Sequence, residues 1–513
     1  MNPLIGLGAD GDAWLRVDGS TRRVTYAEID AIERGRRPRW VLSSAAAIYP
    51  VLRRNGVRLD RCYDLGHAQT ILDAFDGAWR APAIAVPAET PMLFTAGDTP
   101  DVDAGQVAQA RYAAQRTRLD LSGQPAALRL LIAIDSVGAL LAVEMTEAGL
   151  PWDVEAHQRL LEQALGPRPP AGARPQRLAE FVDEIGSIFG REVNPDSPQD
   201  LLAAFARDGI ELRSTRRWYL AGVDHPAVAP LLRYKELARL HTANGWTWLR
   251  EWVHDGRFRP GYLPAGVVTG RWAARGGGAL QIPKQLRSAV VADPGRVLVV
   301  ADAAQLEPRI LAAMSGDPGM VRAAGAEDMY EALAAEAFDG DRQRAKIGLL
   351  GAMYGQVGGG AIRPLQVLRA RYPRALGLLE SAARTGERGG LVRTHLGRTS
   401  PPRQQRDPTP AQERARGRFT RNFVVQGTAA EWAVSMLGIL RTRLFAAYGD
   451  SETARIVFFQ HDEVMVHCAS EVAEEVVGHI EQAAVAATRL LFGQTEVVFG
   501  LDVRAAPTYA EAH

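Results

Sequence analysis

The sequence feature that most constrains the fold is a pair of strand-like apolar segments that meet aspartates. The run VLVVA leads into Asp302, and the run ARIVFFQHDEVMVHC carries Asp462 in a short polar turn between two β-like halves. Two such halves around a tight polar turn predict a β-hairpin. If the strand before Asp302 pairs with this hairpin, both carboxylates face one point.

Two carboxylates in that arrangement can bind two divalent ions about 3.5–4 Å apart, one activating an attacking hydroxyl and the other stabilising a leaving phosphate. Magnesium suits all-oxygen ligands and keeps waters and substrate phosphates in its shell. Each aspartate also has a simpler interpretation, because Asp302 could cap a helix and Asp462 could be an ordinary turn residue. The pattern therefore indicates a magnesium site, with a cap and a turn as the alternative.

A third segment could bind phosphate. Arg342, Lys346, Leu350 and Tyr354 recur every four residues, and each step drifts only about 40° around an α-helix, so all four share one face. The two cations could neutralise a triphosphate, and Tyr354 offers an aromatic platform. The alternative is a solvated basic face that runs into a core leucine and tyrosine.

Composition excludes several classes of protein. With 513 residues, 47% hydrophobic and 23% charged, the chain is typical of a soluble globular protein of about three or four units. Cys62 and Cys468 are too few for a disulfide framework and are expected to be inert buried thiols. We expect no secretory signal and no membrane span. A net charge of +1 still allows nucleic-acid binding through a local positive groove.

Together, the three segments resemble the bacterial family A, or polymerase I-like, DNA polymerases over about residues 126–513. The family's Asp-x-x-x-x-Glu-x-Arg stretch corresponds to Asp302, Glu307 and Arg309. Its Arg-x-x-x-Lys-x-x-x-aromatic-Gly-x-x-Tyr-Gly helix and its His-Asp-Glu hairpin also have counterparts. The matching residues are Arg342, Lys346, Leu350-Gly351, Tyr354-Gly355, His461-Asp462-Glu463, Thr269-Gly270-Arg271, Leu280-Gln281-Ile282-Pro283, Arg418, Asn422 and Gln426-Gly427-Thr428-Ala429.

The resemblance implies a mixed α/β (α+β) fold, a right-hand polymerase of the short type without a 5′-nuclease. It divides the chain into a degenerate, RNase H-like 3′-5′ exonuclease-type domain at 1–125, a thumb with connecting helices at 126–261, a first part of the palm at 262–318, fingers at 319–418, and a second part of the palm at 419–513.

The resemblance also implies a role for each matching residue. The catalytic residues would be Asp302, Asp462, Glu463 and Lys346, with the metal bound by Asp302, Asp462 and the backbone carbonyl of Ala303. The incoming nucleotide would contact Arg342, Lys346, Leu350, Tyr354, Glu307 and His461. DNA would contact Arg271, Gln281, Arg287, Arg418, Asn422 and Gln426.

The implied activity is a DNA-directed DNA polymerase that uses two Mg²⁺ ions, with Mn²⁺ as a substitute. Its partners would be primer–template DNA and deoxynucleoside triphosphates, without a membrane, and we expect a monomer in the bacterial cytoplasm, associated with the nucleoid. Three departures stand out: Leu350 replaces an aromatic residue, Ala303-Ala304 replaces a polar or aromatic pair, and the 44 residues from Asp302 to Lys346 form a shorter gap than the family's.

The N-terminal region lacks the carboxylates that an exonuclease needs. Residues 45–72 resemble the middle of a 3′-5′ exonuclease domain, but Ala47 stands where a metal-binding aspartate belongs. In the segment YAAQR, Arg116 stands where another belongs, and no strand is followed by Asp-x-Glu. Asp64 alone cannot hold two ions. We therefore predict an inactive domain that supports the thumb, preceded in the chain by no 5′-nuclease, and interpret residues 80–105 as a surface loop.

Four alternatives remain. The chain could be a non-catalytic DNA-binding scaffold with a polymerase fold, but a pure binder needs no metal-binding carboxylates. It could be a bifunctional polymerase with residual 3′-5′ exonuclease activity, or a proofreading nuclease in its own right, which the missing carboxylates oppose. A single-subunit RNA polymerase would tend to have His-Asp-Ser in the hairpin, whereas this chain has His461-Asp462-Glu463.

Overall fold

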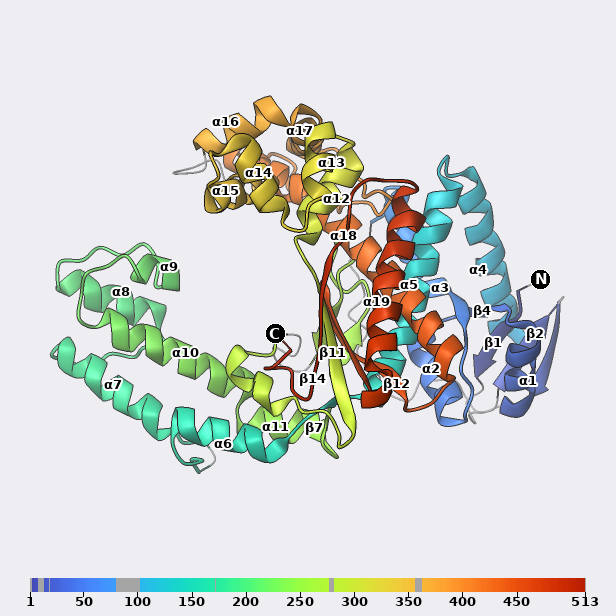
Figure 1. The fold of residues 1–513 in the computed structure, drawn as a ribbon, viewed down its shortest axis with the longest axis horizontal. Coiled ribbons are helices and arrows are strands. Elements are labelled where there is room, and N and C mark those ends of the chain that lie inside the picture. Colours follow the sequence, from blue (N-terminus) through green and yellow to red (C-terminus); the bar gives the residue numbers. More distant parts are fainter. Residues whose placement is uncertain are drawn as a thin grey trace. The chain divides into compact units, whose positions relative to one another are not determined.

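The computed structural model describes residues 2–7, 13–17, 19–79, 102–170, 172–275, 281–355 and 362–512. The chain divides into two compact units. Unit 1 comprises Met1–Ala148, Tyr262–Ala273 and Val299–Ala505, and unit 2 comprises Gly149–Gly261, Ala274–Leu298 and Ala506–His513. The fold is mixed α/β, as the sequence predicts (Figure 1).

Unit 1 begins with a five-stranded mixed sheet in the order β3-β2-β1-β4-β5. The first three strands form an antiparallel meander, and β4 and β5 continue the sheet parallel to β1. Ile5, Trp40 and Tyr49 are fully buried in its core. The elements are β1 (Leu4–Leu7), β2 (Ala13–Val17), β3 (Ser20–Val24), α1 (Tyr26–Arg36), β4 (Arg39–Leu42), α2 (Ala45–Arg54), β5 (Arg61–Asp64) and α3 (Leu65–Phe75).

Two long helices follow, α4 (Val102–Leu121) and α5 (Pro125–Ala148). The sequence predicts a loop over residues 80–105. Residues 80–101 lie outside the described residues. The predicted end of the loop at residue 105 is wrong, because α4 already begins at Val102. Helix α5 is apolar on most of its surface and packs on β5, α2 and β12, so it joins the N-terminal sheet to the second sheet of unit 1.

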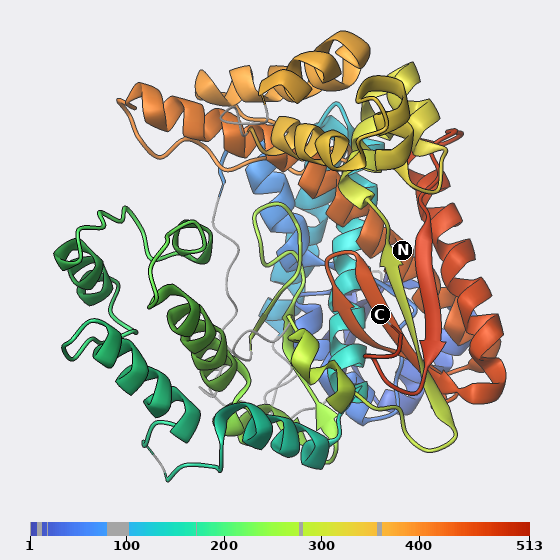
Figure 2. The ribbon, with the colours of Figure 1, turned by 60° about the vertical axis from the view of Figure 1, so that its left-hand side comes forward.

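That second sheet has the order β12-β13-β11-β14. Figures 1 and 2 both show α19 running alongside it, and α18, α19 and α5 pack on it or on one another. The predicted strand and hairpin are therefore present. The elements are β11 (Arg296–Ala303), β12 (Ala454–Gln460), β13 (Glu463–Ala469), β14 (Leu501–Ala506), α18 (Pro410–Tyr448), η3 (Ser470–Val472) and α19 (Ala473–Phe492).

Between β11 and α18 in the sequence, the described residues form a group of six helices. Each packs on its neighbour in the chain, and α12, α15 and α17 also contact α18. Three of the six helices begin at a side-chain cap, where Asp317, Asp328 and Asp341 accept hydrogen bonds from the first turn. The helices are α12 (Leu306–Ser315), α13 (Pro318–Ala324), α14 (Met329–Ala337), α15 (Arg342–Tyr354), α16 (Ile362–Arg371) and α17 (Pro373–Glu387).

Unit 2 is mainly helical, with the three-stranded sheet β6-β8-β7. Its core includes a cluster of Trp152, His157, Trp248 and Phe258, whose rings lie 4.9–5.7 Å apart. The elements are β6 (Leu150–Pro151), α6 (Val154–Leu165), α7 (Gln176–Ile188), α8 (Pro198–Arg207), α9 (Arg217–Leu220), α10 (Val228–Asn244), α11 (Trp246–Trp252), β7 (Val253–His254), β8 (Arg257–Phe258) and η1 (Lys284–Ala289), and the strands β9 (Gly261–Leu263) and β10 (Ala273–Arg275) form a separate pair.

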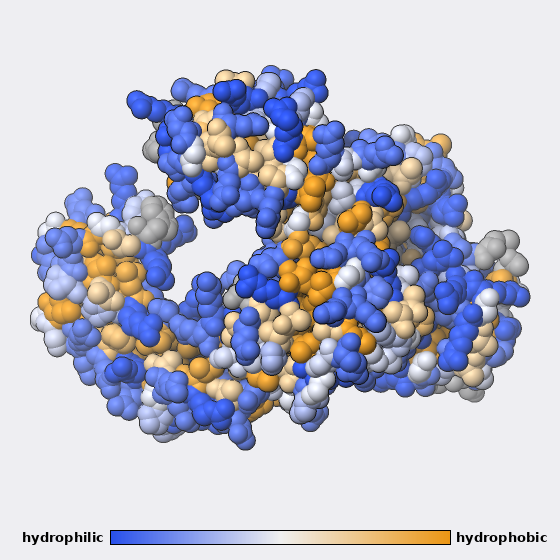
Figure 3. Space-filling model, in the orientation of Figure 1, coloured by the Kyte–Doolittle hydropathy of each residue, from blue (hydrophilic) through white to orange (hydrophobic). Residues whose placement is uncertain are grey.

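Helices α5 and α18 are long and apolar enough to cross a membrane by length and composition. However, 61% and 83% of their most apolar windows are buried inside the protein, which is the behaviour of core helices. The face in Figure 3 is mostly hydrophilic with smaller apolar patches. Cys62 and Cys468 are both buried free thiols, as predicted.

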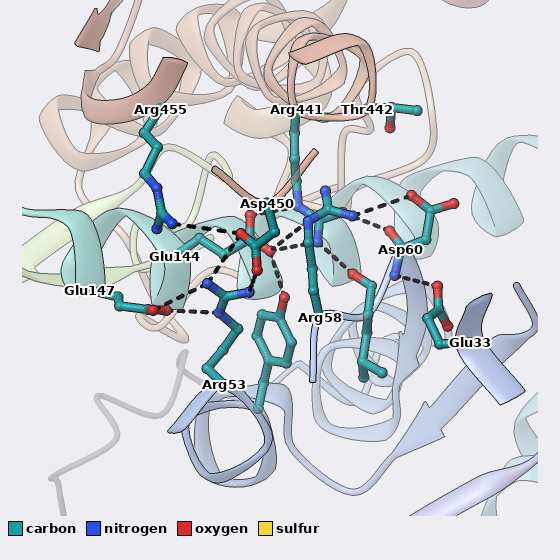
Figure 4. Close-up of polar contacts among 12 residues, drawn as sticks. Glu33, Arg53, Arg58, Asp60, Glu144, Glu147, Arg441, Thr442, Asp450 and Arg455 are labelled. Carbon is teal, nitrogen blue, oxygen red and sulfur yellow. Dashed lines mark hydrogen bonds and ion pairs between the residues drawn. The ribbon is translucent and has the colours of Figure 1, made fainter. Parts of the chain in front are cut away.

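Ion pairs, one of them largely buried and the other at the surface, tie the N-terminal sheet to α5 and α18 (Figure 4). Arg441 of α18 donates to Glu144 of α5 at 2.7 Å and to the backbone carbonyl of Asp60 at 2.7 Å. Arg53 of α2 lies between Glu147 and Asp450 and donates to Glu147 at 2.8 Å. The first 148 residues are therefore packed against the second sheet of unit 1 through charged as well as apolar contacts.

Candidate active site

One predicted aspartate lies near a strand end and the other in the turn of the neighbouring hairpin. Asp302 is near the end of β11, and Asp462 lies in the turn that joins β12 to β13. Strand β13 is next to β11 in the sheet, and the backbone N–H of Ala303 donates to the carbonyl of Asp462 at 3.0 Å. The turn is tight, because His461 adopts a left-handed φ of 58°. The sheet therefore brings the two positions together.

The electrostatics of this pair suit a divalent cation. Burial and the nearby negative charge of Asp302 raise the pKa of Asp462 to about 6, with the Arg271 charge opposing. A cation would relieve this repulsion, and two carboxylates with a backbone carbonyl form an all-oxygen donor set. Among the described residues, no group of three or more His, Cys, Asp or Glu side chains is arranged to hold a metal. The Ala303 carbonyl, which the sequence resemblance implies as a further ligand, directly follows Asp302 in the chain.

Glu463 follows Asp462 directly and is buried at the start of β13, opposite Gln460. His461 precedes the aspartate, and its Nδ1 is buried without a hydrogen-bond partner among the described residues. Burial and the Arg271 charge lower the pKa of His461, so its ring is neutral at pH 7. The turn therefore presents a neutral imidazole beside the two carboxylates.

Glu307 links three parts of the site. It lies in the first turn of α12 and is hydrogen-bonded by Arg271, and the Tyr354 hydroxyl of α15 donates to its other oxygen at 2.9 Å. Burial and this carboxylate raise the pKa of Tyr354 to about 12, so the phenol stays a donor. Arg271 and Glu307 are mostly buried, so the network is an ordered part of the site.

Helix α15 begins at Asp341, which accepts from the N–H of Arg344 at 2.9 Å. Arg342 and Lys346 both lie over the ring of Tyr330, at 5.7 and 6.0 Å from its centroid. Lys346 makes no ion pair within the described part of the chain, whereas Arg342 donates twice to Asp328, at 2.9 and 2.7 Å. Two cations thus share one face of the helix, as the four-residue spacing predicts.

The same face continues to Leu350, which is half-buried, and to Tyr354, which is exposed beyond its hydrogen bond. The helix ends at Gly355 in a left-handed conformation, with φ of 70°. A Cβ on this glycine would lie 2.6 Å from Cγ of Arg418. The motif glycine is therefore needed both for the helix end and for the close approach of α18.

Three predicted DNA contacts form a partly exposed stripe on α18. Arg418, Asn422 and Gln426 are four residues apart; Arg418 is exposed, and Asn422 and Gln426 are partly exposed. Next to Gln426, a Cβ on Gly427 would lie 2.4 Å from the Thr394 methyl group and 3.2 Å from the Thr269 carbonyl. The segment containing Thr269 and Arg271 therefore packs closely on this helix.

Gln281 and Arg287 belong to unit 2 and are described with it. Gln281 is exposed and accepts a hydrogen bond from Arg239 at 3.3 Å. The Arg287 guanidinium lies 4.6 Å from the ring centroid of Tyr509, and its Nε has no partner among the described residues. Their predicted role in DNA binding stays a prediction.

Two structural residues of the site were not assigned a role from the sequence. Arg309 is fully buried and donates to the backbone carbonyls of Ala304, Ala324, Val498, Ala326 and Glu327. It matches the last position of the Asp-x-x-x-x-Glu-x-Arg stretch, which indicated its importance but not its partners. Its hydrogen bonds fix the start of α12, where Glu307 lies.

Asp328 is the second. Besides holding Arg342, it accepts from Gln305 at 2.9 Å and caps α14 through the N–H of Tyr330 at 2.8 Å. A residue such as Asp328, three positions before Glu331, is a recognisable helix-start signal, so the cap could have been predicted. The ion pair with Arg342 depends on the packing of α14 against α15 and has no local signal.

In the N-terminal sheet domain, Asp64 is the carboxylate that remains from the expected exonuclease set, and its oxygens accept hydrogen bonds from backbone N–H groups. Asp64 is buried and accepts from the N–H groups of Ala45, Gly66 and His67 at 2.6, 2.8 and 2.9 Å. It therefore fixes the starts of α2 and α3. Ala47 lies in α2 and Arg116 is exposed on α4.

The model of DNA polymerase family A matches residues 173–511. DNA polymerase I of Deinococcus radiodurans is 25% identical over 344 residues, which cover 58% of this chain and 35% of the relative. The thermostable DNA polymerase I of Thermus thermophilus is 27% identical over 382 residues, which cover 68% of this chain and 43% of the relative. DNA polymerase I of Pseudomonas aeruginosa is 26% identical over 410 residues, which cover 71% of this chain and 44% of the relative.

The chain thus spans less than half the length of these curated relatives. A solved structure, the POL domain of Pol1 from M. smegmatis in complex with DNA primer-template and dNTP, has a similar fold. The TM-score is 0.76 at 19% identity, covering 100% of this chain and 96% of that one. The match of the family model over most of the chain shows that this protein belongs to DNA polymerase family A.

Proposed function

We propose that this chain is a DNA-directed DNA polymerase, which adds deoxynucleotides to a primer 3′ end by phosphoryl transfer with two Mg²⁺ ions, replaceable by Mn²⁺. The observation that carries the proposal is that Asp302 lies near the end of β11 and Asp462 in the turn between β12 and β13, where the Ala303 N–H reaches the Asp462 carbonyl at 3.0 Å. Family membership supports the reaction class.

Asp302, Asp462 and the Ala303 carbonyl would hold the ions, which when bound would activate the attacking hydroxyl and stabilise the leaving phosphate. Glu463 would support them from the start of β13. Arg342 and Lys346 would bind the triphosphate from their shared face of α15, and Lys346 would donate a proton to the departing pyrophosphate. Because Asp328 already holds Arg342, nucleotide binding must compete with that ion pair.

Three residues would position the nucleotide's base and sugar. Tyr354 would stack near the template base and nascent pair, and Leu350 would pack on the sugar. Glu307 would exclude a ribose 2′-hydroxyl, and its hydrogen bonds to Arg271 and Tyr354 hold it in place for that task. The neutral His461 beside the carboxylates would contact the nucleotide.

The stripe of Arg418, Asn422 and Gln426 on α18 would bind the primer–template, together with Arg271, Gln281 and Arg287. The structural match is a complex with primer-template and dNTP, which supports DNA and deoxynucleotides as partners. We propose the palm at 262–318 and 419–513, the fingers at 319–418, and the thumb with connecting helices at 126–261. We further propose a monomer that works in the bacterial cytoplasm at the nucleoid.

Primer extension tests this function. We would compare wild type with Asp302→Ala, and use Asp502→Ala as a matched control, because Asp502 lies on the adjacent strand β14 but is exposed and pairs only with Arg504 within the described part of the chain. Wild type and the control should extend a labelled primer with Mg²⁺ and deoxynucleotides, and Asp302→Ala should not. Absence of wild-type extension with tight primer–template binding would instead favour the non-catalytic scaffold.

We propose that the N-terminal domain at 1–125 is an exonuclease-like fold without nuclease activity. Its strand order β3-β2-β1-β4-β5 suits an RNase H-like sheet, and the three backbone N–H donors on Asp64 leave this carboxylate a structural role. A 3′-labelled primer incubated with Mg²⁺ and without nucleotides should stay intact. Shortening that persists in Asp302→Ala would reveal a surviving exonuclease.

A further inference from the structure

A turn between α17 and α18 carries Arg398, an arginine that has no role in the mechanism proposed above. The N–H of Thr394 donates to the Arg398 carbonyl at 3.0 Å, and the N–H of Arg398 donates to the Thr394 hydroxyl at 2.9 Å. Glu431 of α18 accepts from the Thr394 hydroxyl and, at 3.1 Å, from the N–H of Leu396. The turn is therefore fixed to α18 and presents Arg398 in a defined position.

The Arg398 side chain is paired with Asp135 of α5, which lies 263 residues earlier in the sequence. Its guanidinium donates to both carboxylate oxygens, at 2.8 and 3.0 Å, and the two side chains are only 12% and 6% exposed. Removing either partner of such a pair would leave the other charge buried and uncompensated. The pair therefore holds the guanidinium between α5 and α18, within unit 1.

The guanidinium packs directly on the backbone of Gly270. A Cβ on this glycine would lie 2.5 Å from Nε and 2.7 Å from Cζ of Arg398, so no other residue fits there. Gly270 has a left-handed φ of 88°, which glycine adopts without strain. Its N–H donates to the Val267 carbonyl at 2.8 Å, and the N–H of Val267 donates to the Arg271 carbonyl at 3.1 Å. Arg398 thus covers a second tight turn, at residues 267–271.

Arg271, which directly follows Gly270, leads from this turn into the candidate active site. It is hydrogen-bonded to Glu307, and Tyr354 donates to the other oxygen of that carboxylate at 2.9 Å. A shift of the backbone at Gly270 would therefore move Arg271 and, through it, the carboxylate of Glu307. Contacts between packed groups carry such shifts because the interior of a protein has few voids to absorb them.

We propose that Asp135 and Arg398 are positioning residues that hold the turn at 267–271, so that Arg271 keeps Glu307 in place, and that they thereby set how strongly ribonucleotides are excluded. The inference rests on the proposed function, in which Glu307 excludes a ribose 2′-hydroxyl. Asp135 and Arg398 act through Arg271, and the specificity of the site depends on a pair from outside it.

Primer extension with one nucleotide at a time measures the discrimination, as the ratio of kcat/KM for a deoxynucleoside triphosphate to that for the matching ribonucleoside triphosphate. In Arg398→Met and in Asp135→Asn this ratio should fall about tenfold, because a displaced Glu307 leaves room for the 2′-hydroxyl. Use of the deoxynucleotide itself should fall only a few-fold. Arg398→Lys keeps a cation beside Asp135 and should restore part of the ratio.

Arg441→Met is the matched control, because it breaks the other buried ion pair of α5, with Glu144. Arg441 also donates to the carbonyls of Leu59 and Asp60 and so serves a different part of unit 1. This variant should lose stability and keep the wild-type ratio, which separates a general loss of stability from a loss of discrimination. An unchanged ratio in both Arg398→Met and Asp135→Asn, with wild type extending primers, would overturn the inference and leave the proposed function standing.

Amide hydrogen exchange in the full chain, without DNA or nucleotide, tests the positioning independently of activity. Peptides that cover residues 267–271 should exchange about tenfold faster in Arg398→Met and in Asp135→Asn than in wild type, because the turn loses the group that covers it. Arg441→Met should leave this exchange unchanged. If wild type did not extend primers, the proposed function would fail, and faster exchange would still support the positioning. Unchanged exchange in both variants would overturn it.

Discussion

Arg441 of α18 donates hydrogen bonds to both carboxylate oxygens of Glu144 on α5, at 2.7 and 2.6 Å. Both side chains are nearly excluded from solvent. The same guanidinium reaches the backbone carbonyls of Leu59 and Asp60 in the N-terminal domain. One residue thus fastens three segments that are far apart in the sequence, beside the strand β12 that leads to Asp462.

We expect Arg441→Met to lower the free energy of unfolding by about 3–5 kcal/mol, because it leaves the Glu144 carboxylate buried without its partner. The double variant Arg441→Met/Glu144→Met should recover part of this loss, since it removes both charges. Urea unfolding would measure both, with Arg414→Met, an exposed position on the same helix, as control. Equal stability of the two single-site variants, Arg441→Met and Arg414→Met, would refute the structural role of the pair.

Arg309→Lys should lower the free energy of unfolding by about 2–4 kcal/mol, because an ammonium has three donors and cannot satisfy the five carbonyls that Arg309 now reaches. The same change should loosen α12 and so reduce primer extension. Thermal unfolding and extension rates would be measured together. Arg322→Lys, at an exposed arginine on α13, should change neither.

Much of the active site could be predicted because its signals are local. The strand before Asp302 and the hairpin around Asp462 are visible as continuous apolar runs beside polar residues. The four-residue spacing of Arg342 and Lys346 follows the helical period of 3.6 residues. Some helix ends have no such signal: α10 ends at Asn244, and α11 begins at Trp246 after Gly245 alone.

The interactions that could not be predicted join distant segments. Arg309 is hydrogen-bonded to Val498, 189 residues away, and Arg441 to Asp60, 381 residues away. The sequence around these arginines does not indicate their partners. The partners are backbone carbonyls, and their positions depend on how the whole unit packs. A buried arginine and an exposed one look alike until the fold is known.

Lys346→Ala should reduce kcat by about 10²–10³-fold, the magnitude typical of losing one group that stabilises developing charge. Arg342→Ala should mainly raise KM for the nucleotide, because Arg342 is exposed and would contact the triphosphate in the ground state as well. Arg344→Ala is the control, since Arg344 is exposed on the same helix but on another face. Steady-state extension at varied nucleotide concentration would show whether the two effects separate in this way.

Asp328→Asn should lower KM for the nucleotide, because Arg342 would no longer be held by a carboxylate at 2.7 Å and would be available to the triphosphate. Asparagine can still cap α14, so the helix should remain. The matched control is Asp341→Asn at the cap of α15, which holds no arginine side chain among the described residues. An unchanged KM in Asp328→Asn would show that the ion pair does not compete with the nucleotide.

Glu431 of α18 should make stability depend on pH. It is buried, accepts from Thr394 and from the N–H of Leu396 at 3.1 Å, and burial raises its pKa to about 7, with the Arg398 charge opposing. The pKa of a glutamate in the unfolded chain is about 4.3. Because the folded value is the higher one, the stabilisation from protonated Glu431 is complete below the unfolded pKa and is lost as the pH rises through about 7.

Glu431→Gln should remove this dependence, since glutamine stays neutral throughout. Glutamine keeps the acceptor for Thr394 but loses the one for Leu396, so the variant should be less stable than wild type at pH 5. The difference in unfolding free energy between wild type and variant should become smaller or change sign by pH 8, because Glu431 of the wild type then carries a buried negative charge that destabilises the fold. Urea unfolding of both proteins from pH 5 to 8 would measure it, and parallel curves would show that Glu431 does not titrate in this range.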